Sequence, residues 1–399
     1  MAARLQEIGR QAWIVGGAVR DLALGIPAQD VDLATDAHPS EVERLFERTA
    51  AVGKAFGTVI VLGGEREVQV TTFRTERGYS DARRPDEVTF GTSVAEDAAR
   101  RDFTCNAMYL GPTSDELHDP TGGLSDLGAG RLVCVGDATE RFREDGLRLL
   151  RLARFAAAFG LEVDEETRAA AQASVGRVVG VSAERLHGEL VRVAAGREPG
   201  RALRLLEEID VLRRILPGVE LDVPAVERLG PEPGPVRMLA ALLRGGRRAQ
   251  ALEGLRPSRD ERARVEAAWS AEDALRELAR REDGGSRSEL VLFLREPGFE
   301  DGLALLRARV GSTAEDGLEP LLALRASLPA AKLRPEPFLT SQDLARSGVS
   351  PGPAFGALLA EAERLQLDLV LADRAAALRW LEERLQRPGD ARRASASES

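Results

Sequence analysis

Two acidic residues separated by one apolar residue, Asp30 and Asp32, are the first feature of the sequence that points to chemistry. On a β-strand, positions i and i+2 face the same side, so the two carboxylates would point together and Val31 would face away. Like charges held this close are unfavourable unless a cation lies between them. Two magnesium ions held there would form a clamp for in-line attack of a 3′-hydroxyl on an α-phosphate. We therefore predict that Asp30 and Asp32 are catalytic metal ligands, although an isolated Asp-x-Asp is more often part of a loop or surface turn.

Glycines upstream of this pair strengthen the interpretation. A strand predicted within residues 12–19 ends in Gly16-Gly17, and a helix is expected to begin just after it. Glycine lets the backbone come close to a phosphate, and the amides at a helix start favour an anion. Arg20 would add a side-chain contact to the phosphate. Other phosphate-binding motifs are excluded, because the sequence has no G-x-x-x-x-G-K-[ST] motif and no complete dinucleotide-binding unit.

A second regular spacing of charged residues lies further along the chain. Asp145, Arg148, Arg151 and Arg154 recur every three residues, so on a helix they would form a slanting stripe along one face. A carboxylate accepts from an exocyclic amine, and a guanidinium donates to a ring nitrogen or carbonyl oxygen. Cytosine and adenine both offer an amine beside an acceptor, so such a stripe can choose a base without a nucleic-acid template. The alternative is an ordinary amphipathic helix with a salt-bridged surface.

The elements that would position these residues change in character near residue 137. Before it, strands predicted over 12–19, 57–64 and 67–73 alternate with helices, one of them over 39–50 with Ser40 as its cap. After it the pattern is helical. One long helix is predicted over 138–160, and further helices over 165–175, 182–195, 200–214, 235–250, 257–281 and 287–296. A linker is predicted over 327–337, a small helical unit over 338–386 and a disordered end over 387–399.

Composition limits the class of protein without deciding the function. The 399 residues are 43% hydrophobic, enough for about two to four structural units. A net charge of −10 argues weakly against an RNA partner, and the near-exclusive use of arginine over lysine fits either phosphate recognition or a GC-rich genome. Two cysteines exclude a disulfide framework. Because we find neither a secretory signal nor a bilayer-spanning apolar run, we expect a cytoplasmic protein with no membrane partner. No protein partner is evident.

Taken together, residues 15–35 resemble the first motif of the class II tRNA nucleotidyltransferases, which share the fold of the DNA polymerase β superfamily with bacterial poly(A) polymerases. The segment 99–110 resembles the second motif of this family. The resemblance implies that Arg101 touches the incoming nucleotide, that Asp102 meets ribose hydroxyls and that Mg²⁺ is the cofactor. The segment 118–127 resembles the third motif, a hinge.

The stripe and the segment after it also match motifs of this family. Residues 141–155 resemble the fourth motif, which implies that Asp145 and Arg148 read the base, while 182–190 resemble the fifth, which braces the preceding helix. The nucleotide-binding residues predicted by spacing and resemblance together are Gly16, Gly17, Arg20, Arg101, Asp102, Asp145, Arg148, Arg151 and Arg154.

The fold class expected from the resemblance is α+β. A nucleotidyltransferase head with a small mixed sheet would occupy 1–136, followed by an all-helical neck at 137–200 that selects the base, a body at 201–330 and a tail at 331–386 that binds tRNA. The disordered C-terminus would begin at residue 387. The expected partners are tRNA, with CTP and ATP as substrates.

Four reactions within the family, and one reading outside catalysis, are compatible with these motifs. The segment 73–90 is rich in charge and is predicted to be a mobile loop, similar to the flexible loop that CC-adding enzymes lack. Asn-Ala-Met at 106–108 and the tail-like C-terminus favour tRNA over poly(A) synthesis. Addition of the full CCA sequence is therefore preferred, with addition of A alone as the alternative. A poly(A) polymerase or a catalytically silent RNA-binding protein is disfavoured.

Overall fold

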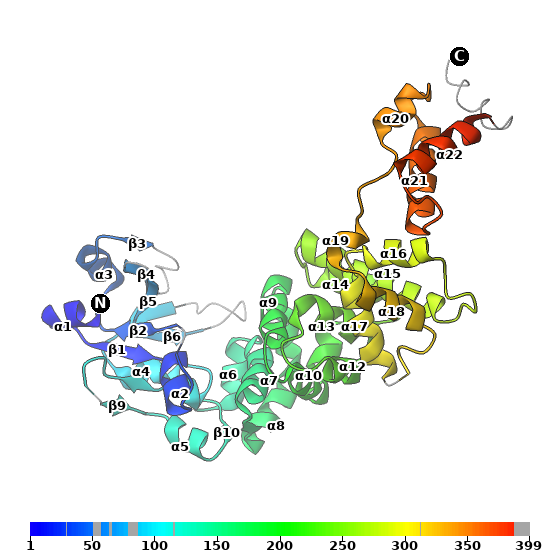
Figure 1. Cartoon of the computed structure of the whole chain (residues 1–399). Helices are drawn as coiled ribbons and strands as arrows, with labels where there is room; N and C mark the ends of the chain where they lie inside the picture. Colours follow the sequence, from blue (N-terminus) through cyan, green and yellow to red (C-terminus); the bar gives the residue numbers. More distant parts are fainter. Residues whose placement is uncertain are drawn as a thin grey trace. The chain divides into compact units, whose positions relative to one another are not determined.

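The computed structural model describes most of the chain in two compact units, Met1–Arg262 and Ala263–Ser399 (Figure 1). The residues described are 1–28, 30–50, 57–63, 66–78, 87–114, 116–311 and 313–386. No helix among them is both long and apolar enough to cross a lipid bilayer. The predicted disordered end at 387–399 lies outside the described residues.

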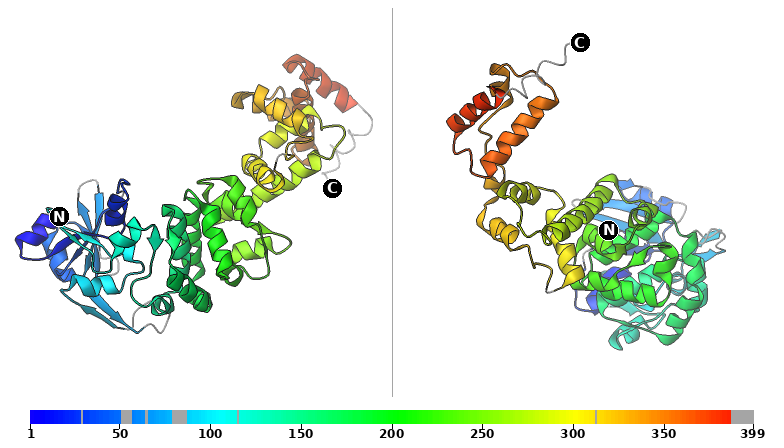
Figure 2. Two further views of the ribbon diagram at one scale, coloured as in Figure 1. Left: turned by 90° about the horizontal axis from the view of Figure 1, so that it is seen from below. Right: turned by 90° about the vertical axis from the view of Figure 1, so that its right-hand side faces the viewer.

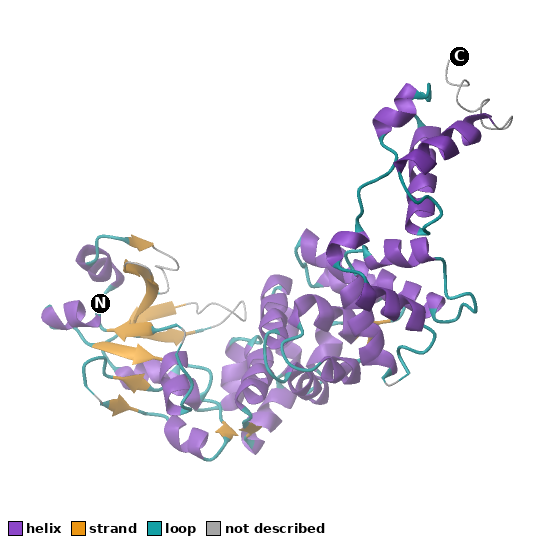
Figure 3. Cartoon of the chain, in the orientation of Figure 1, coloured by secondary structure: helices purple, strands orange, loops and turns teal. Residues whose placement is uncertain are grey.

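The N-terminal part of the first unit is built on a mixed sheet of seven strands (Figure 3). In spatial order these strands are β3 (Thr49–Ala50), β4 (Thr58–Gly63), β5 (Arg66–Thr72), β2 (Asp32–Thr35), β1 (Ala12–Val15), β8 (Tyr109–Leu110) and β9 (Leu117–His118). The pair β2–β5 is parallel and its neighbours are antiparallel. The expected α+β head with a small mixed sheet is confirmed.

Side-chain alternation gives this sheet a core on each face. Leu33 and Ala34 are neighbours on β2, yet Leu33 packs with Leu5 of α1 (Ala2–Glu7) and Val42 of α3 (Pro39–Leu45), whereas Ala34 packs with a different set. That second set includes Ala98 of α4 (Val94–Ala99). Successive residues of a strand point to opposite faces, so one strand can serve both cores. The sheet therefore contributes residues to an apolar cluster on each of its faces.

Two predictions for the head are wrong in their details. Helix α3 ends at Leu45, and residues 49–50 form β3, so the predicted helix over 39–50 is too long. Its cap is His38, whose ring nitrogen accepts from the backbone amide of Ser40, so Ser40 is the capped residue and not the cap. Pro39 favours this start, because proline suits the first position of a helix.

The predicted mobile loop at 73–90 is structured at both ends. Strands β6 (Arg74–Arg77) and β7 (Glu87–Phe90) pair antiparallel, so residues near the two ends of the segment form a hairpin. Residues 79–86, on which the flexible-loop interpretation chiefly depends, lie outside the described residues.

The long helix predicted over 138–160 is two helices, α6 (Ala138–Glu144) and α7 (Arg148–Phe159). The helix is interrupted at Asp145, which has extended backbone angles (φ −145°, ψ 106°). Gly146 explains the break: a Cβ on this residue would lie 2.4 Å from the carbonyl oxygen of Arg177, so the chain packs against the next segment more closely than a side chain allows. The predicted stop at Gly160 is confirmed, with φ +65° in the left-handed region.

The rest of the first unit is helical with short two-residue strands. Its elements are β10 (Arg131–Leu132), β11 (Glu162–Val163), α8 (Glu165–Ala173), η3 (Val175–Gly180), α9 (Ala183–Ala194), α10 (Pro199–Glu208), α11 (Val211–Ile215), β12 (Glu220–Leu221), α12 (Val223–Leu229), α13 (Gly234–Leu242), β13 (Leu243–Arg244) and α14 (Arg248–Gly254). The predicted helices over 200–214 and 235–250 are thus each interrupted. In the first case the interruption is Asp210, which adopts a left-handed conformation (φ 61°) between α10 and α11.

The second unit contains helices with two apolar clusters. Its helices are most of α15 (Arg259–Leu278), then α16 (Arg287–Leu294), α17 (Phe299–Val310), α18 (Glu319–Ser327), α19 (Ala330–Leu333), α20 (Ser341–Arg346), α21 (Pro353–Leu367) and α22 (Arg374–Gln386). The predicted linker therefore contains a short helix, α19. Helices α21 and α22, whose ribbons can be followed in Figure 2, pack through a cluster that includes Ala362, Ala377 and Leu381. The predicted helical unit over 338–386 thus has its own core, and the finer division into neck, body and tail stays a prediction.

Candidate active site

Sheet register brings the glycines and the acidic pair to the same edge. Strand β1 ends at Val15, which pairs on one side with Asp32, the first residue of β2, and on the other with Tyr109 of β8. Gly16 follows immediately with φ +69° and ψ −126°, a conformation that L side chains rarely adopt. Helix α2 (Gly17–Ala23) then begins. The predicted order of strand, glycine turn and helix is confirmed, and Asp32 starts its strand beside that turn.

The two carboxylates at this edge are exposed and influence each other. Burial raises the pKa of the Asp32 carboxyl, the positive charge of Arg101 lowers it, and the negative charge of Asp30 raises it further, so the net shift is upward. Asp30 precedes β2 and is not part of it, so the premise that both acids lie on one strand is wrong. The charge of Asp30 nevertheless acts on Asp32, so the two carboxylates lie within electrostatic range of each other. They form no hydrogen bond or ion pair with any residue that the structure describes.

This pair has the chemistry of a divalent-cation site. Mg²⁺ prefers oxygen ligands and is commonly held by one or two carboxylates together with substrate phosphates. Burial is the main cause of the raised Asp32 pKa, and a cation between Asp30 and Asp32 would relieve the repulsion that adds to it. Within the described parts of the chain, no group of three or more His, Cys, Asp or Glu side chains is arranged around a metal position. The donors therefore fit a metal that takes its remaining ligands from a nucleotide and water.

Arg101 lies beside the glycine turn and is held by a residue that sequence reasoning missed. A Cβ on Gly16 would lie 3.4 Å from Nη1 of Arg101. The guanidinium donates to the Tyr109 hydroxyl at 3.0 Å and to the Asp97 carboxylate at 3.2 Å. Asp97 is 1% exposed and also accepts from Tyr109 at 2.6 Å and from Arg100 at 2.6 Å. The sequence signal for Asp97 was its spacing to Arg100 and Arg101, which lie three and four residues further along and can pair with it across a helical turn.

Asp102, predicted to meet ribose hydroxyls, accepts hydrogen bonds from within the protein on both of its carboxylate oxygens. One oxygen accepts from Nε and Nη2 of Arg151 at 2.8 and 2.5 Å, and the other from the Asn106 amide at 3.1 Å and the Phe103 backbone at 2.9 Å. Burial alone would raise the pKa of Asp102, but the charges of Arg151 and Arg148 outweigh it and hold the pKa well below its usual range. Asp102 therefore joins the head to α7, and its contact with ribose stays a prediction.

Arg20, predicted to contact phosphate, is 7% exposed and makes bonds within the protein. Its guanidinium donates to Asp21 at 2.7 and 3.0 Å and to the side-chain oxygen of Asn106 at 2.7 Å. It also lies 4.1 Å from the ring centre of Phe159 and 5.2 Å from that of Phe155, both on α7. Asn106 was not singled out from the sequence as a site residue, although it is the only asparagine among the 399 residues.

Asp145 and Arg148, the predicted base-reading pair, stand on either side of the α6–α7 break. Both Asp145 oxygens accept from Arg185 of α9, at 3.1 and 2.7 Å, and one also accepts from the Leu147 backbone amide at 3.0 Å. The expected bracing role of residues 182–190 agrees with this contact. Arg148 donates to Glu144 at 2.6 Å and to the carbonyl oxygens of Arg141 and Arg100 at 2.9 and 3.0 Å.

The other two arginines of the stripe share one buried acid. Glu189 of α9 is 1% exposed; it accepts from Nε of Arg154 at 2.8 Å, and Arg151 lies 4.0 Å away. Burial lowers the pKa of Arg151, while the charges of Asp102, Glu189 and Asp145 raise it, so these acids all lie within electrostatic range of it. The stripe is therefore wrong as a single helix face, since Asp145 precedes α7, but Asp145, Arg151 and Arg154 all approach residues of α9.

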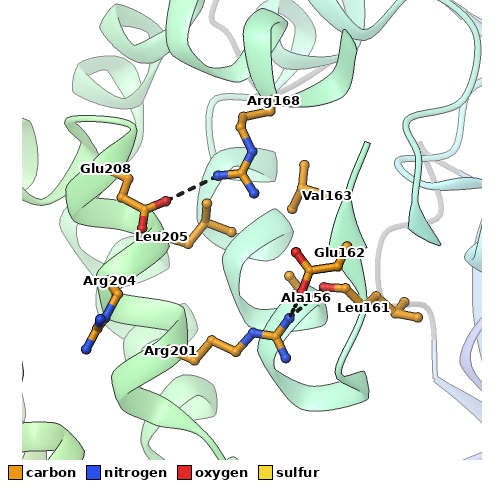
Figure 4. A pocket seen from close by; sticks show the side chains of 9 residues that line it. All are labelled: Ala156, Leu161, Glu162, Val163, Arg168, Arg201, Arg204, Leu205 and Glu208. Atoms are coloured by element: carbon orange, nitrogen blue, oxygen red, sulfur yellow. Dashed lines mark hydrogen bonds and ion pairs between the residues drawn. The ribbon is translucent and has the colours of Figure 1, made fainter. Parts of the chain in front are cut away.

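The cavity in Figure 4 contains none of the predicted site residues. It measures about 200 Å³ and lies between α7, β11, α8 and α10. Arg168 donates to Glu208 at 3.2 Å and Arg201 donates to Glu162 at 2.8 Å, as the dashed lines show. The third arginine, Arg204, bonds Glu227. Because each cation already has an acidic partner, we assign no ligand to this cavity.

Comparison with known proteins agrees with this geometry. Residues 12–133 match the family model described as "Poly A polymerase head domain", and residues 160–222 match "Probable RNA and SrmB-binding site of polymerase A". The chain is 42% identical over 226 residues to a CCA-adding enzyme of Latilactobacillus sakei and 45% identical over 218 residues to one of Bacillus pumilus. These alignments cover 57% and 55% of the chain, and 56% and 54% of the relatives. The chain thus spans about half the length of the curated relatives it matches.

Solved structures match over nearly the whole chain. The Bacillus stearothermophilus CCA-adding enzyme in complex with CTP has a TM-score of 0.76 and 28% identity, with 96% of this chain and 95% of that chain covered. The Thermotoga maritima CCA-adding enzyme complexed with tRNA has a TM-score of 0.71 at 21% identity, with 96% and 94% covered, which supports the fold alone. Nucleotidyltransferases of this type generally depend on a divalent metal. The chain thus contains a region similar to the poly(A) polymerase head domain, with the glycine turn and the paired acids inside it, followed by a region similar to the RNA-binding segment of those polymerases.

Proposed function

We propose that the chain adds CCA to the 3′ end of tRNA, using CTP and ATP and releasing pyrophosphate without a nucleic-acid template. The observation that carries this proposal is the exposed pair Asp30 and Asp32 beside the Gly16-Gly17 turn. The similarity to CCA-adding enzymes supports the choice of substrate. Addition of A alone to tRNA that already ends in CC is the competing reaction.

Asp30 and Asp32 would hold Mg²⁺, which when bound assists deprotonation of the attacking 3′-hydroxyl and neutralises the triphosphate. The Gly16-Gly17 turn lets the triphosphate approach the backbone, because no side chain projects there. Arg101 lies against the same turn and is fixed by Asp97 and Tyr109, so its position is set before a nucleotide arrives. Such preorganised charge is the main contribution of a protein to phosphoryl transfer.

The hydrogen-bonding capacity left on Asp145 and Arg148 matches the edge of cytosine or adenine. Asp145 accepts three bonds, two from Arg185 and one from Leu147, which leaves one of its about four acceptor positions for an exocyclic amine. Arg148 uses three of its five N–H donors, which leaves Nε and one hydrogen of Nη2 for a ring nitrogen or carbonyl oxygen. Uracil and guanine would present a carbonyl oxygen to the carboxylate, which is repulsive.

RNA contact is proposed for two regions outside the head. Residues 160–222 match a family model whose description includes RNA binding. The helical tail at 338–386, with its own core, is the second region, and we propose that it binds tRNA. Phosphate contacts give affinity that falls with salt, so binding by either region should weaken as ionic strength rises.

The test is incubation with Mg²⁺, labelled CTP and labelled ATP on three tRNAs that end before C74, before C75 and before A76. Extension of all three to the full CCA end supports the proposal. Extension of the last alone identifies an A-adding enzyme, and long A tails on any RNA identify a poly(A) polymerase. RNA binding without extension would leave the chain a silent RNA-binding protein. Glu47→Ala, at an exposed acid of the head remote in sequence from the pair, is the matched control for Asp32→Ala.

A further inference from the structure

We propose that Asn106 is a positioning residue that couples the phosphate-binding turn to the base-selecting helix α7. This inference rests on the proposed function and assigns a role to a residue that does not itself touch the substrate. Its chain of contacts, called here the relay, consists of Arg20, Asn106, Asp102 and Arg151. The relay begins on α2 just after the glycine turn and ends on α7.

The four members are joined by hydrogen bonds that involve charged groups; the first three are buried, and the Arg151 side chain is partly exposed. Arg20 donates to Oδ1 of Asn106 at 2.7 Å, Nδ2 of Asn106 donates to Asp102 at 3.1 Å, and Arg151 donates to the other oxygen of Asp102 at 2.8 and 2.5 Å. Arg20, Asn106 and Asp102 are 7%, 6% and 8% exposed. Water screens these bonds little, so a change at one member is felt by the next.

Only an amide satisfies the middle position. Its oxygen must accept from a guanidinium while its nitrogen donates to a carboxylate, and no other side chain of this size offers one acceptor and one donor on a planar group. A carboxylate there would bond Arg20 but repel Asp102, and an apolar side chain would leave both charges without this partner. The composition is consistent with a specific requirement, because Asn106 is the sole asparagine in the chain.

Both ends of the relay contact elements of the candidate site. At the first end, a Cβ on Gly17 would lie 3.5 Å from Nη2 of Arg20. The backbone carbonyl oxygen of Asn106 also accepts from Arg101 at 3.2 Å. At the other end, Arg151 follows Arg148 by three residues on α7. Stacking of Arg20 on Phe159 at 4.1 Å adds a second connection to the same helix. Movement of the turn on triphosphate binding would therefore reach the helix that reads the base.

The decisive experiment compares three variants of the full chain. Asn106→Asp removes the donor to Asp102. The double variant Asn106→Asp with Asp102→Asn exchanges the amide and the carboxylate, so each bond of the relay can re-form with the roles reversed. Thr104→Val is the matched control, because Thr104 is also buried in the same turn and donates to the buried Asp126 at 2.8 Å outside the relay.

The readout is the ratio of kcat/KM for CTP over UTP on a tRNA that ends before C74. We expect Asn106→Asp to lower this ratio about tenfold or more, as for residues coupled in one network. The double variant should recover selectivity relative to Asn106→Asp, and Thr104→Val should keep the ratio within about twofold even if its Tm falls. An unchanged ratio in Asn106→Asp, or an equal fall in Thr104→Val, would overturn the proposal.

Hydrogen exchange supplies a readout that does not require activity. Asn106→Asp should speed amide exchange both in α2 and in α7, whereas Thr104→Val should speed it only around its own turn and residues near Asp126. If the wild-type chain fails to extend any tRNA, the proposed function fails while the relay is still judged by this pattern. Unchanged exchange in α7 would overturn the relay even in an active enzyme.

Discussion

Two pairs of aspartates in the head have opposite surroundings. Asp30 and Asp32 are exposed, interact unfavourably with each other and, within the described residues, lack cationic partners in direct contact. Asp97 and Asp102 are buried and saturated with arginine, amide and hydroxyl donors. The pKa of Asp32 is raised and the pKa values of Asp97 and Asp102 are lowered. Asp30 and Asp32 are thus available to bind an external cation, whereas Asp97 and Asp102 hold arginine side chains within the protein.

This contrast shows how the site meets two incompatible demands. A metal-binding acid must retain repulsion that a cation can relieve, which costs stability in the absence of the cation. The arginines that surround a nucleotide must not drift, which requires buried acids that hold them. The first pair should therefore matter for catalysis and cost stability, while the second should matter for stability and act on catalysis only through position.

Removing the metal-binding charge should have the largest effect. We expect Asp32→Asn to lower the rate of nucleotide transfer by on the order of a thousandfold or more. The loss of one carboxylate charge weakens binding of the cation that would act on both the attacking hydroxyl and the triphosphate. Binding of tRNA, measured by filter retention, should be unchanged, since the proposed RNA contacts lie elsewhere. Glu47→Ala should transfer nucleotides at the wild-type rate. Substantial turnover by Asp32→Asn would contradict the metal role.

Removing a bracing charge should act on stability. Asp97→Ala leaves its two arginines and Tyr109 without a buried acceptor, which should lower the free energy of unfolding of the head by about 3–5 kcal/mol. Fluorescence of Trp13 during urea unfolding reports on the head once Trp269 and Trp380 are replaced by Phe. Glu47→Ala is again the control and should change stability by less than about 0.5 kcal/mol. A decrease of under 1 kcal/mol in the free energy of unfolding of Asp97→Ala would show that Asp97 does not stabilise the head through its arginines.

The base-reading pair should show an intermediate effect that is visible as selectivity. Asp145→Ala removes the one acceptor available to an exocyclic amine, so discrimination of C and A against U and G should fall by about 1–3 kcal/mol, roughly tenfold to a hundredfold. The measurement is kcat/KM for each of the four nucleotides on one tRNA. Affinity for tRNA should change little. Unaltered selectivity would refute base reading by Asp145.

The exposed pair leaves a local pattern in the sequence, whereas the contacts of the buried pair do not. Asp30 and Asp32 were singled out because an Asp-x-Asp beside glycines is a local pattern, and the strands followed from local periodicity, whereas the α+β class was implied by the resemblance. Arg20 and Asp102, whose contacts with the nucleotide stay predictions, bond Asn106 and Arg151, which lie 86 and 49 residues away in the chain. Such partners are set by tertiary packing and leave little trace in local spacing.

The α6–α7 break shows the same limit. The charge and leucine pattern of 138–160 is continuous with one helix, and only Gly146 departs from it. A glycine is required at this position because a Cβ would lie 2.4 Å from the carbonyl oxygen of Arg177. That contact comes from another segment of the chain. The sequence did offer a signal for Asn106, because it is the only asparagine in the chain.

The smallest expected effect is the most direct test of the contrast, because its two halves have opposite signs. In EDTA at pH 7, Asp32→Asn should be more stable than the wild-type chain, since a raised pKa means that the charged form of Asp32 is disfavoured in the folded state. That gain should shrink as the pH falls through the raised folded pKa and vanish below the unfolded value of about 3.9. Asp102→Asn should be less stable at pH 7, because its folded pKa is lowered, and its deficit should persist down to about pH 3.9 before it declines.

Thermal unfolding of the three proteins between pH 7 and pH 3 measures both halves at once. Adding excess Mg²⁺ should reverse the first sign, because a cation that binds the folded wild-type chain stabilises it and cannot do so as well in Asp32→Asn. The second sign should not respond to Mg²⁺, since Asp102 is engaged by Arg151 and Asn106. Equal signs for the two variants in EDTA would mean that both acids are braces, and the metal assignment would then have no physical support from the charge of Asp32.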